Sequence, residues 1–169
     1  AELHSFFGEL SKIFSNNVKV LSSSIDDRQR KIITDELGNA GSNFRNKIYG
    51  QGFSGSKEIL PAKELSAFVN TSLEFIEHSI KANKRKDNLY HAYNLLSFEN
   101  YGVKISHLSE MLEGQVAVLS SGFLPADEGL QLLDALRQSA LYRKDQNSYI
   151  LYPNKALKKF AEKNFVPVS

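Results

Sequence analysis

Apolar residues recur every three or four positions between Pro61 and Ala82, and this spacing predicts an α-helix with one apolar face. Pro61 suits the start of a helix because its fixed backbone angle and missing N–H match the needs of the first turn. We expect the fold to bury much of this face. The residues of the apolar series are Leu65, Phe68, Val69, Leu73, Ile76 and Ile80.

The same periodicity predicts two helices earlier in the chain. A first helix is expected over residues 2–14, and a second is expected from the serines at 22–24 to about residue 49. The second helix runs through Gly38 and Gly41, each of which costs on the order of 1 kcal/mol inside a helix. We therefore interpret these glycines as positions where a neighbouring helix comes close.

The second half of the chain begins with a different pattern. Apolar and polar residues nearly alternate over residues 95–107, with turn-forming residues at 100–102, and this predicts a small β-hairpin. Two more helices are expected, one capped by Ser106 and ending near Ser121, the other starting at Pro125.

The chain ends in a tyrosine-rich extended segment that Pro153 interrupts. A short helix is then expected from about Asn154, with Leu157 and Phe160 buried. The complete pattern predicts a mainly α fold, an antiparallel helical bundle of five or six helices with one small β-hairpin. The side chains expected in its core are Phe6, Leu37, Phe44, Phe68, Ile76, Leu112, Leu119 and Leu133.

Length and composition limit the class of protein. A chain of 169 residues fits one helical domain over residues 1–169, and 41% hydrophobic with 24% charged residues is ordinary for a globular fold. The absence of cysteine excludes disulfides, thiol catalysis and thiolate metal sites. A net charge of +2 provides no global field for nucleic acid or anionic lipid, so any such binding would be local.

The ends and the hydropathy of the chain lead to two further expectations. The sequence begins at Ala1 and its only methionine is Met111, so we expect a piece excised from a larger polypeptide. No apolar run approaches the ~20 residues that cross a bilayer, and the first residues lack the blocks of a signal peptide. We expect a soluble chain without a membrane partner, and the cytoplasm is favoured.

Polar and aromatic residues concentrate in residues 83–105, where a basic run precedes a group of tyrosines and amides. Such side chains combine ring faces with polar tips and suit a pocket for a polar ligand. A second group of similar character follows at residues 142–152. The candidate ligand-binding residues of the two groups are Tyr90, His91, Tyr93, Asn94, Tyr142, Arg143, Asp145, Gln146, Tyr149 and Tyr152.

Two interpretations of these groups stay open. In one, both groups line a single concave site, with ring faces for a sugar and amides or Arg143 for its hydroxyls. In the other, the tyrosines seal the ends of helices and their hydroxyls bond to the backbone.

Other catalytic or binding patterns receive little support. The four histidines lack metal-ligand spacing, and the sequence predicts no metal site, no cofactor and no catalytic residue. Glu110 and Glu113 share a helix face, which is a poor way to flank a scissile bond. Residues 50–55 formally match G-x-G-x-x-G, but no strand precedes them, so a helix end and loop is favoured.

The basic run over residues 81–86 and the tyrosines after it are a weak indication of nucleic-acid binding. Cations at a helix C-terminus that complement the helix dipole explain the run more simply. Nucleic acid is therefore not expected as a partner, although single-stranded nucleic acid stays as a further alternative.

Four runs of sequence together carry a resemblance to a known group: YGQGFSG at residues 49–55, NKRKDNLYHAYNLL at 83–96, MLEGQVAVLSSG at 111–122 and LYRKDQNSYILYPNK at 141–155. The chain resembles a helical segment of very large bacterial polypeptides described as cellobiose-phosphorylase-like, over roughly residues 49–166. The family name implies phosphorolysis or hydrolysis of β-glucosides on a helical toroid. The paired aspartate motif that supplies the general acid in those phosphorylases has no counterpart here.

The resemblance implies a non-catalytic helical accessory domain of a large carbohydrate-active protein, which contributes to sugar binding. Its expected partners are the remainder of the parent polypeptide and an oligosaccharide. The alternative function from a different class is a helical protein-interaction module, which would leave a contiguous apolar patch on one face.

Overall fold

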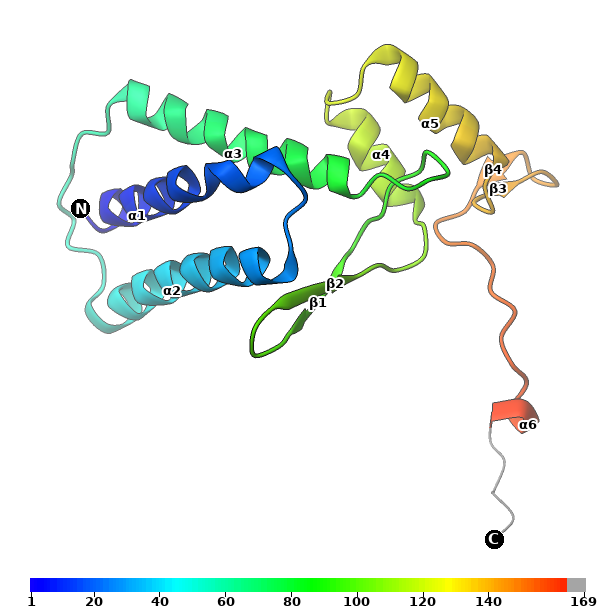
Figure 1. Ribbon diagram of the computed structural model, residues 1–169, viewed down its shortest axis with the longest axis horizontal. Helices are drawn as coiled ribbons and strands as arrows, with labels where there is room; N and C mark the ends of the chain where they lie inside the picture. The colour runs from blue at the N-terminus through cyan, green and yellow to red at the C-terminus, as the bar shows by residue number, and fades with distance from the viewer. Residues whose placement is uncertain (164–169) are drawn as a thin grey trace, which may run out of the picture. The chain divides into compact units, whose positions relative to one another are not determined.

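The computed structural model describes residues 1–163 of the chain. This part divides into two compact units (Figure 1): the first unit comprises residues 1–84 and 93–108, and the second comprises residues 85–92 and the residues from 109 onward. Among the described residues there are six α-helices, one 3-10 helix and two small two-stranded sheets. The predicted mainly α class is confirmed.

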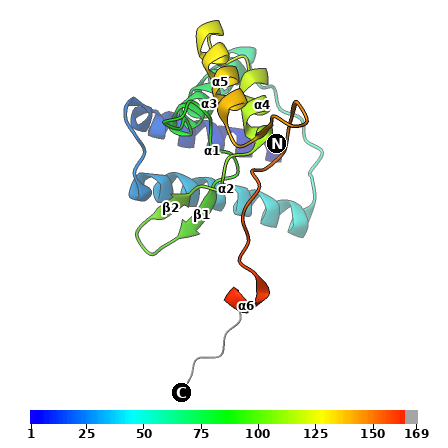
Figure 2. The ribbon, with the colours of Figure 1, turned by 90° about the vertical axis from the view of Figure 1, so that its right-hand side faces the viewer.

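Three long helices form most of the first unit: α1 (Glu2–Asn17), α2 (Asp27–Gln51) and α3 (Ala62–Ala82). Figures 1 and 2 show α1 lying between α2 and α3. Aromatic side chains of α1 pack on both neighbours, because the helical repeat directs phenylalanines to two sides of that helix. Phe6 stacks on Phe44 of α2 with ring centroids 4.5 Å apart. The ring centroid of Phe14 lies 5.8 Å from that of Phe68 and 5.1 Å from that of Phe75, and both of these residues are on α3.

The start of α2 differs from the prediction. Asp26 caps this helix, since its carboxylate accepts from the backbone N–H of Gln29 at 2.7 Å while the Gln29 side chain accepts from the Asp26 N–H at 3.0 Å. This capping box satisfies two N–H groups that the first turn leaves unpaired. The segment before it forms a 3-10 helix, η1 (Val18–Ser22), so the predicted capping by the serines at 22–24 is wrong.

The glycines of α2 do not have the predicted role. The helix continues through Gly38 and Gly41 as expected. A Cβ at Gly38 would meet nothing within 4 Å, and one at Gly41 would meet only Arg45 of the same helix, at 3.3 Å. The expectation that a neighbouring helix comes close here is therefore wrong. The glycine-rich residues 50–55 end the helix, with Gly52 as its C-cap at φ 72°.

The predicted β-hairpin is confirmed and belongs to the first unit. Strands β1 (Leu95–Phe98) and β2 (Val103–Ser106) pair antiparallel, with Leu95 opposite Ser106. The hairpin lies beside α2 (Figure 2), where Arg30 donates to the Val103 carbonyl at 2.6 Å. A Cβ at Gly102 would lie 3.0 Å from the Asp27 Cβ, so the turn of the hairpin packs closely on the start of the helix.

The second unit is built from α4 (Leu112–Ser120), α5 (Ala126–Gln138) and a second hairpin of β3 (Tyr142–Arg143) and β4 (Ser148–Tyr149). The predicted capping of α4 by Ser106 is wrong, because that residue pairs in β2 and Met111 is the N-cap. The second hairpin was not predicted. Its turn contains Asn147 at φ 47°, a left-handed conformation that asparagine adopts more readily than most residues.

The last helix of the described chain, α6 (Phe160–Lys163), is only four residues long. Leu157 precedes it and is 76% exposed, and Phe160 is 81% exposed. The predicted burial of these two side chains is therefore wrong.

The two units differ in how much apolar surface they bury. In the first unit the buried apolar residues are Ile13, Ala40 and Val103. In the second unit they are Leu89, Tyr90, Met111, Leu132, Leu136 and Leu141.

Of the eight side chains predicted to be in the core, Ile76 and Leu133 are exposed and the other six are only partly buried. The spacing marks a helix face as apolar but does not reveal how much of that face a neighbour covers.

Candidate functional site

The ten candidate ligand-binding residues are divided between the two units. Tyr93 and Asn94 belong to the first unit, and the other eight belong to the second.

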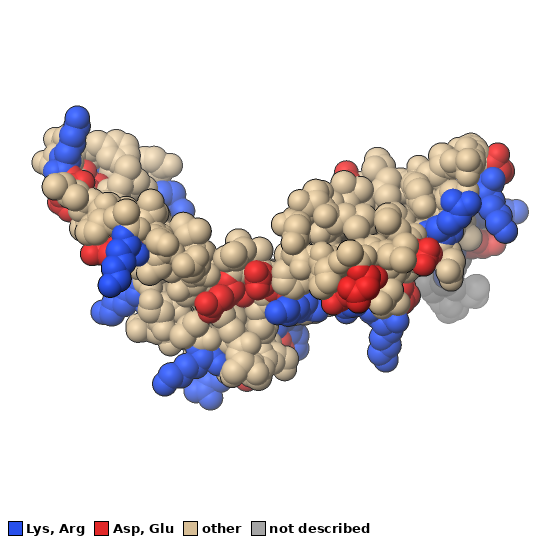
Figure 3. Space-filling model, turned by 90° about the horizontal axis from the view of Figure 1, so that it is seen from above, with Lys and Arg blue, Asp and Glu red and all other residues tan. Residues whose placement is uncertain are grey.

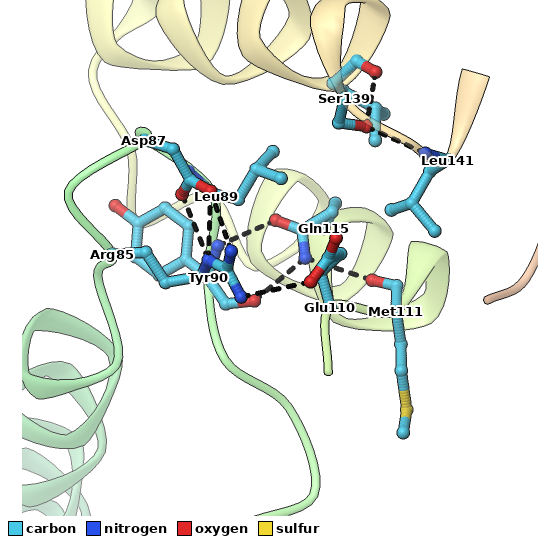
Figure 4. A network of polar contacts seen from close by, with 10 residues as sticks. Arg85, Asp87, Leu89, Tyr90, Glu110, Met111, Gln115, Ser139 and Leu141 are labelled. Carbon is cyan, nitrogen blue, oxygen red and sulfur yellow. Dashed lines mark hydrogen bonds and ion pairs between the residues drawn. The ribbon is translucent and has the colours of Figure 1, made fainter. Parts of the chain in front are cut away.

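Tyr90 lies in the core of the second unit and is only 2% exposed. Its backbone pairs with the buried side chain of Gln115 on α4 (Figure 4), whose Oε1 accepts from the Tyr90 N–H at 2.8 Å. The Gln115 Nε2 donates to the carbonyls of Tyr90 at 2.9 Å and Met111 at 3.0 Å. Tyr90 is therefore part of the core of this unit, and the neighbouring His91 is half-buried.

The residues before Tyr90 form a charged loop on the same unit (Figure 4). Arg85 binds both carboxylate oxygens of Asp87, with Nε–Oδ1 at 3.0 Å and Nη2–Oδ2 at 2.7 Å, and reaches Glu110 at 3.3 Å. The Arg85 guanidinium lowers the pKa of the Asp87 carboxyl below its ordinary value of 3.8. Hydrogen bonding to Asp87 in turn raises the pKa of Arg85. These bonds occupy Arg85 within the fold.

The second candidate group lies on and after the hairpin β3–β4. Tyr142 and Tyr149 are cross-strand partners, and their ring centroids are 5.2 Å apart. The hydroxyl of Tyr142 donates to Asn147 at 2.5 Å, and Arg143 binds both oxygens of Asp145 at 2.8 and 2.6 Å. Gln146 and Tyr152 are exposed. Several of these candidate residues thus bond to one another inside the hairpin.

An open pocket of about 650 Å³ lies beside Tyr142 in the second unit. Arg137 of α5 lies over the Tyr142 ring, 5.1 Å from its centroid, and Lys144 contributes a second cation. Gln138 and Ser139 complete the lining. The pocket therefore offers hydrogen-bond donors next to an aromatic ring, which is a combination that polar ligands use.

Asn94 belongs to a chain of side-chain hydrogen bonds in the first unit. Asn83 donates to the Ser79 carbonyl, Asn94 Nδ2 donates to Asn83 Oδ1, and Asn94 Oδ1 bonds to His107 Nδ1, each at 2.8 Å. An amide oxygen only accepts, so Nδ1 of His107 carries the proton and Nε2 has the lone pair in the neutral ring. This series of hydrogen bonds thus sets the tautomer of His107.

This hydrogen-bonded chain lines a pocket of about 420 Å³. His78 is also at the pocket, with its Nε2 2.8 Å from the Ser23 carbonyl. Arg30 lines another part but donates to Asp27 at 2.7 Å and to the carbonyls of Val103 and Ile25 at 2.6 and 2.8 Å. Because Arg30 is engaged by these acceptors, the pocket suits a neutral polar ligand better than an anion.

Sequence reasoning identified Asn94 but not Asn83, His78 or His107 as parts of one pocket. His78 bonds to a residue 55 positions away, and His107 to one 13 positions away. Contacts between residues so far apart in the chain leave no local sequence pattern from which they could be predicted. The amide-rich character of residues 83–105 was the only signal available in the sequence.

The basic run at residues 81–86 does not lie in one unit. Lys81 and Lys84 belong to the first unit, whereas Arg85 and Lys86 belong to the second, where Arg85 is bound to acidic groups. On the face of the molecule in Figure 3, Lys and Arg side chains are scattered among acidic and uncharged residues. The run therefore does not form one basic patch on a single unit, which is what a continuous track for a nucleic-acid backbone would need.

Comparison with known proteins adds no assignment: no protein-family model and no curated protein matches this chain. Across residues 1–163, no helix has both the length and the apolar character to cross a membrane. The same residues contain no cluster of three or more His, Asp or Glu side chains placed to bind a metal ion.

Proposed function

We propose that this chain is a non-catalytic helical docking module that binds another protein surface through α3. The parent that such a module would serve is the carbohydrate-active polypeptide that the sequence resemblance implies, and its expected partner is then the remainder of that polypeptide. The observation that supports docking is a row of exposed apolar side chains on α3.

This row, called here the α3 stripe, comprises Leu65, Val69, Leu73 and Ile76. Their side chains are 46%, 52%, 49% and 56% exposed, in that order. They follow one another at helical spacing and therefore lie on one side of the helix. A group of exposed apolar side chains on one surface often marks a binding site for another molecule.

The α3 stripe is separate from the contacts that hold α3 in the first unit. Phe68 and Phe75 pack on Phe7 and Phe14 of α1, and His78 bonds to the carbonyl of Ser23. At a rotation of about 100° per residue, Phe68 and Phe75 lie next to the stripe on the helix surface and His78 lies opposite it. The stripe is thus available to a partner without loss of the packing on α1.

The test is the double substitution Val69→Gln and Leu73→Gln, compared with Ile13→Ala in the core. We expect the stripe variant to keep its helical circular dichroism and to change the free energy of unfolding by less than ~1 kcal/mol at low protein concentration. It should also bind less of an apolar dye. Ile13→Ala should cost about 2–4 kcal/mol. A stripe variant that unfolds as readily as the core variant would show that the stripe is part of the fold, and would refute the docking role.

Oligosaccharide binding is a second candidate, favoured by the pocket beside Tyr142. The pocket combines that ring with Arg137 and Lys144. A titration of the chain with cello-oligosaccharides tests this function, with Lys144→Met expected to weaken binding and Lys19→Met, an exposed lysine of the first unit, as the control. Absence of binding by the unsubstituted chain would count against it.

A further inference from the structure

We infer that the open edge of strand β1 pairs with the same edge of a second copy of this chain, which joins the two β1–β2 hairpins into one four-stranded antiparallel sheet. This surface is not the α3 stripe, so the inference does not depend on the proposed docking function. It follows from the direction of the backbone groups in the hairpin and from the exposure of its side chains.

Alternate residues of β1 direct their backbone groups away from β2. The Glu99 N–H donates to the Gly102 carbonyl at 2.8 Å, so these two residues form a hydrogen-bonded pair. Bonded and non-bonded pairs alternate along an antiparallel ladder, and Leu96 and Phe98 therefore direct their N–H and C=O groups to the other side of the strand. Within residues 1–163 this sheet has only two strands, so no third strand meets these groups.

The two edges of the hairpin differ in what they contact. On β2, the carbonyl of Val103 points away from β1 and accepts from Arg30 of α2 at 2.6 Å, so a side chain of the fold occupies that edge. All four residues of β1, in contrast, are exposed. Edge strands often carry a charge or a proline that prevents pairing with another strand, and β1 has neither. The edge open to a partner is therefore that of β1.

The side chains of β1 indicate what its partner must supply. Leu96 and Phe98 share one face of the hairpin with Val103, because cross-strand partners lie on the same face and neighbours along a strand alternate. Val103 has no exposed surface, whereas Leu96 and Phe98 are 49% and 61% exposed. An added strand extends the buried part of this face only if it presents apolar side chains at alternate positions there. Strand β1 of a second copy has this pattern.

One register of the two β1 strands satisfies both the backbone and the side chains. With Ser97 on the twofold axis, Leu96 of each copy lies opposite Phe98 of the other. The outward backbone groups of these residues then bond to each other across the new pair. Leu95 lies opposite Glu99 of the other copy, so no like charges face each other.

The first experiment measures the mass of the chain by sedimentation velocity up to its highest soluble concentration. The unsubstituted chain should reach the mass of two chains. Ser97→Glu should weaken this dimer about tenfold or more, because the two introduced carboxylates lie directly opposite each other. Within one hairpin Ser97 lies opposite Lys104, so the variant should keep its fold by circular dichroism. The control, Ser106→Glu on β2, should leave the dimer unchanged.

The second experiment tests the register and uses the absence of cysteine in the chain. Ser97→Cys should form a disulfide between two copies on oxidation, because opposite residues of such a pair have Cα atoms roughly 4.5 Å apart, within the reach of a disulfide. Ser106→Cys should not, since three strand spacings separate the two positions by at least about 14 Å. Equal cross-linking of the two variants would overturn the pairing.

Three results of the sedimentation experiment would also overturn the inference. They are a chain that stays monomeric, a dimer that Ser97→Glu leaves intact, and a dimer that dissociates in the Val69→Gln/Leu73→Gln variant, because the α3 stripe would then hold the two copies. The docking function is tested separately by the stability of that last variant, so failure of one proposal is distinguishable from failure of the other.

Discussion

Gln115 holds the backbone of Tyr90 in the manner of a neighbouring β-strand: its amide accepts from the Tyr90 N–H at 2.8 Å and donates to the Tyr90 carbonyl at 2.9 Å. The Gln115 side chain has no exposed surface. A buried amide of this kind fixes the segment from 85 to 92 against α4, because polar groups in a core need partners.

Gln115→Leu should destabilise the second unit. The substitution keeps the approximate size of the side chain but leaves the N–H of Tyr90 and the carbonyls of Tyr90 and Met111 without this partner. Each unpaired buried group costs about 1–3 kcal/mol, so for the three groups we expect a total loss of at least about 3 kcal/mol. Urea unfolding measures it, with Gln146→Leu at an exposed position as the control. Equal stability of the two variants would contradict the structural role of the amide.

Gly114→Ala should disrupt the same contact for a steric reason. A Cβ at Gly114 would lie 2.6 Å from the Cβ of Ala92, which is closer than two carbon atoms that are not bonded to each other can approach. We expect a loss of about 1–3 kcal/mol in the free energy of unfolding. The matched control is Gly129→Ala in α5, where the nearest atom would be 3.9 Å away and alanine should stabilise the helix by about 0.5–1 kcal/mol.

Relief of the clash identifies its cause. The double variant Gly114→Ala/Ala92→Gly removes the methyl group that the new side chain meets, so it should recover much of the lost stability. A double variant less stable than Gly114→Ala alone would show that the clash is not the source of the effect.

The helices were largely predictable because each carries a long apolar period that depends only on its own residues. The third helix follows its pattern from Pro61 to Ala82. The start of α4 was placed too early, because strand pairing of Ser106 with Leu95 overrides the local preference of serine for a helix cap. Boundaries depend on such distant contacts, and periodicity does not contain them.

The candidate sites were predictable only in composition. Tyr90 and Tyr93 are three positions apart in the sequence, yet one is buried in the second unit and the other is 64% exposed in the first. The chain changes units between them. A cluster in the sequence therefore does not guarantee a cluster in space, and the partners of Asn94 became visible only with the fold.

Phe14→Ala should destabilise the first unit more than any single change in the α3 stripe. The Phe14 ring contacts both Phe68 and Phe75, so its removal leaves a cavity and breaks two ring contacts. We expect a loss of about 3–5 kcal/mol by thermal or urea unfolding. Leu3→Ala on the same helix is the control, since Leu3 is 62% exposed and should lose less than ~1 kcal/mol. A similar loss in the two variants would mean that α1 does not hold α3 through these rings.

The decrease in the free energy of unfolding at low pH should depend on Asp87. Arg85 lowers the pKa of this carboxyl below 3.8 in the folded chain, whereas the unfolded chain has the ordinary value. A lowered folded-state pKa contributes stability that is fully present above the unfolded pKa and is lost as the pH falls through the folded pKa. The stabilising effect of Asp87 should therefore be complete at pH 7 and should decline below about pH 4.

Asp87→Asn tests this dependence, since asparagine can keep the hydrogen bond from the Leu89 N–H but cannot carry the charge that faces Arg85. The variant should be less stable than the unsubstituted chain at pH 7, and the difference should shrink as the pH falls below about 4. Urea unfolding from pH 7 to pH 3 measures it, with Asp134→Asn on α5 as the control. A difference that stays constant with pH would mean that the charge of Asp87 does not stabilise the loop, and that its hydrogen bonds alone do.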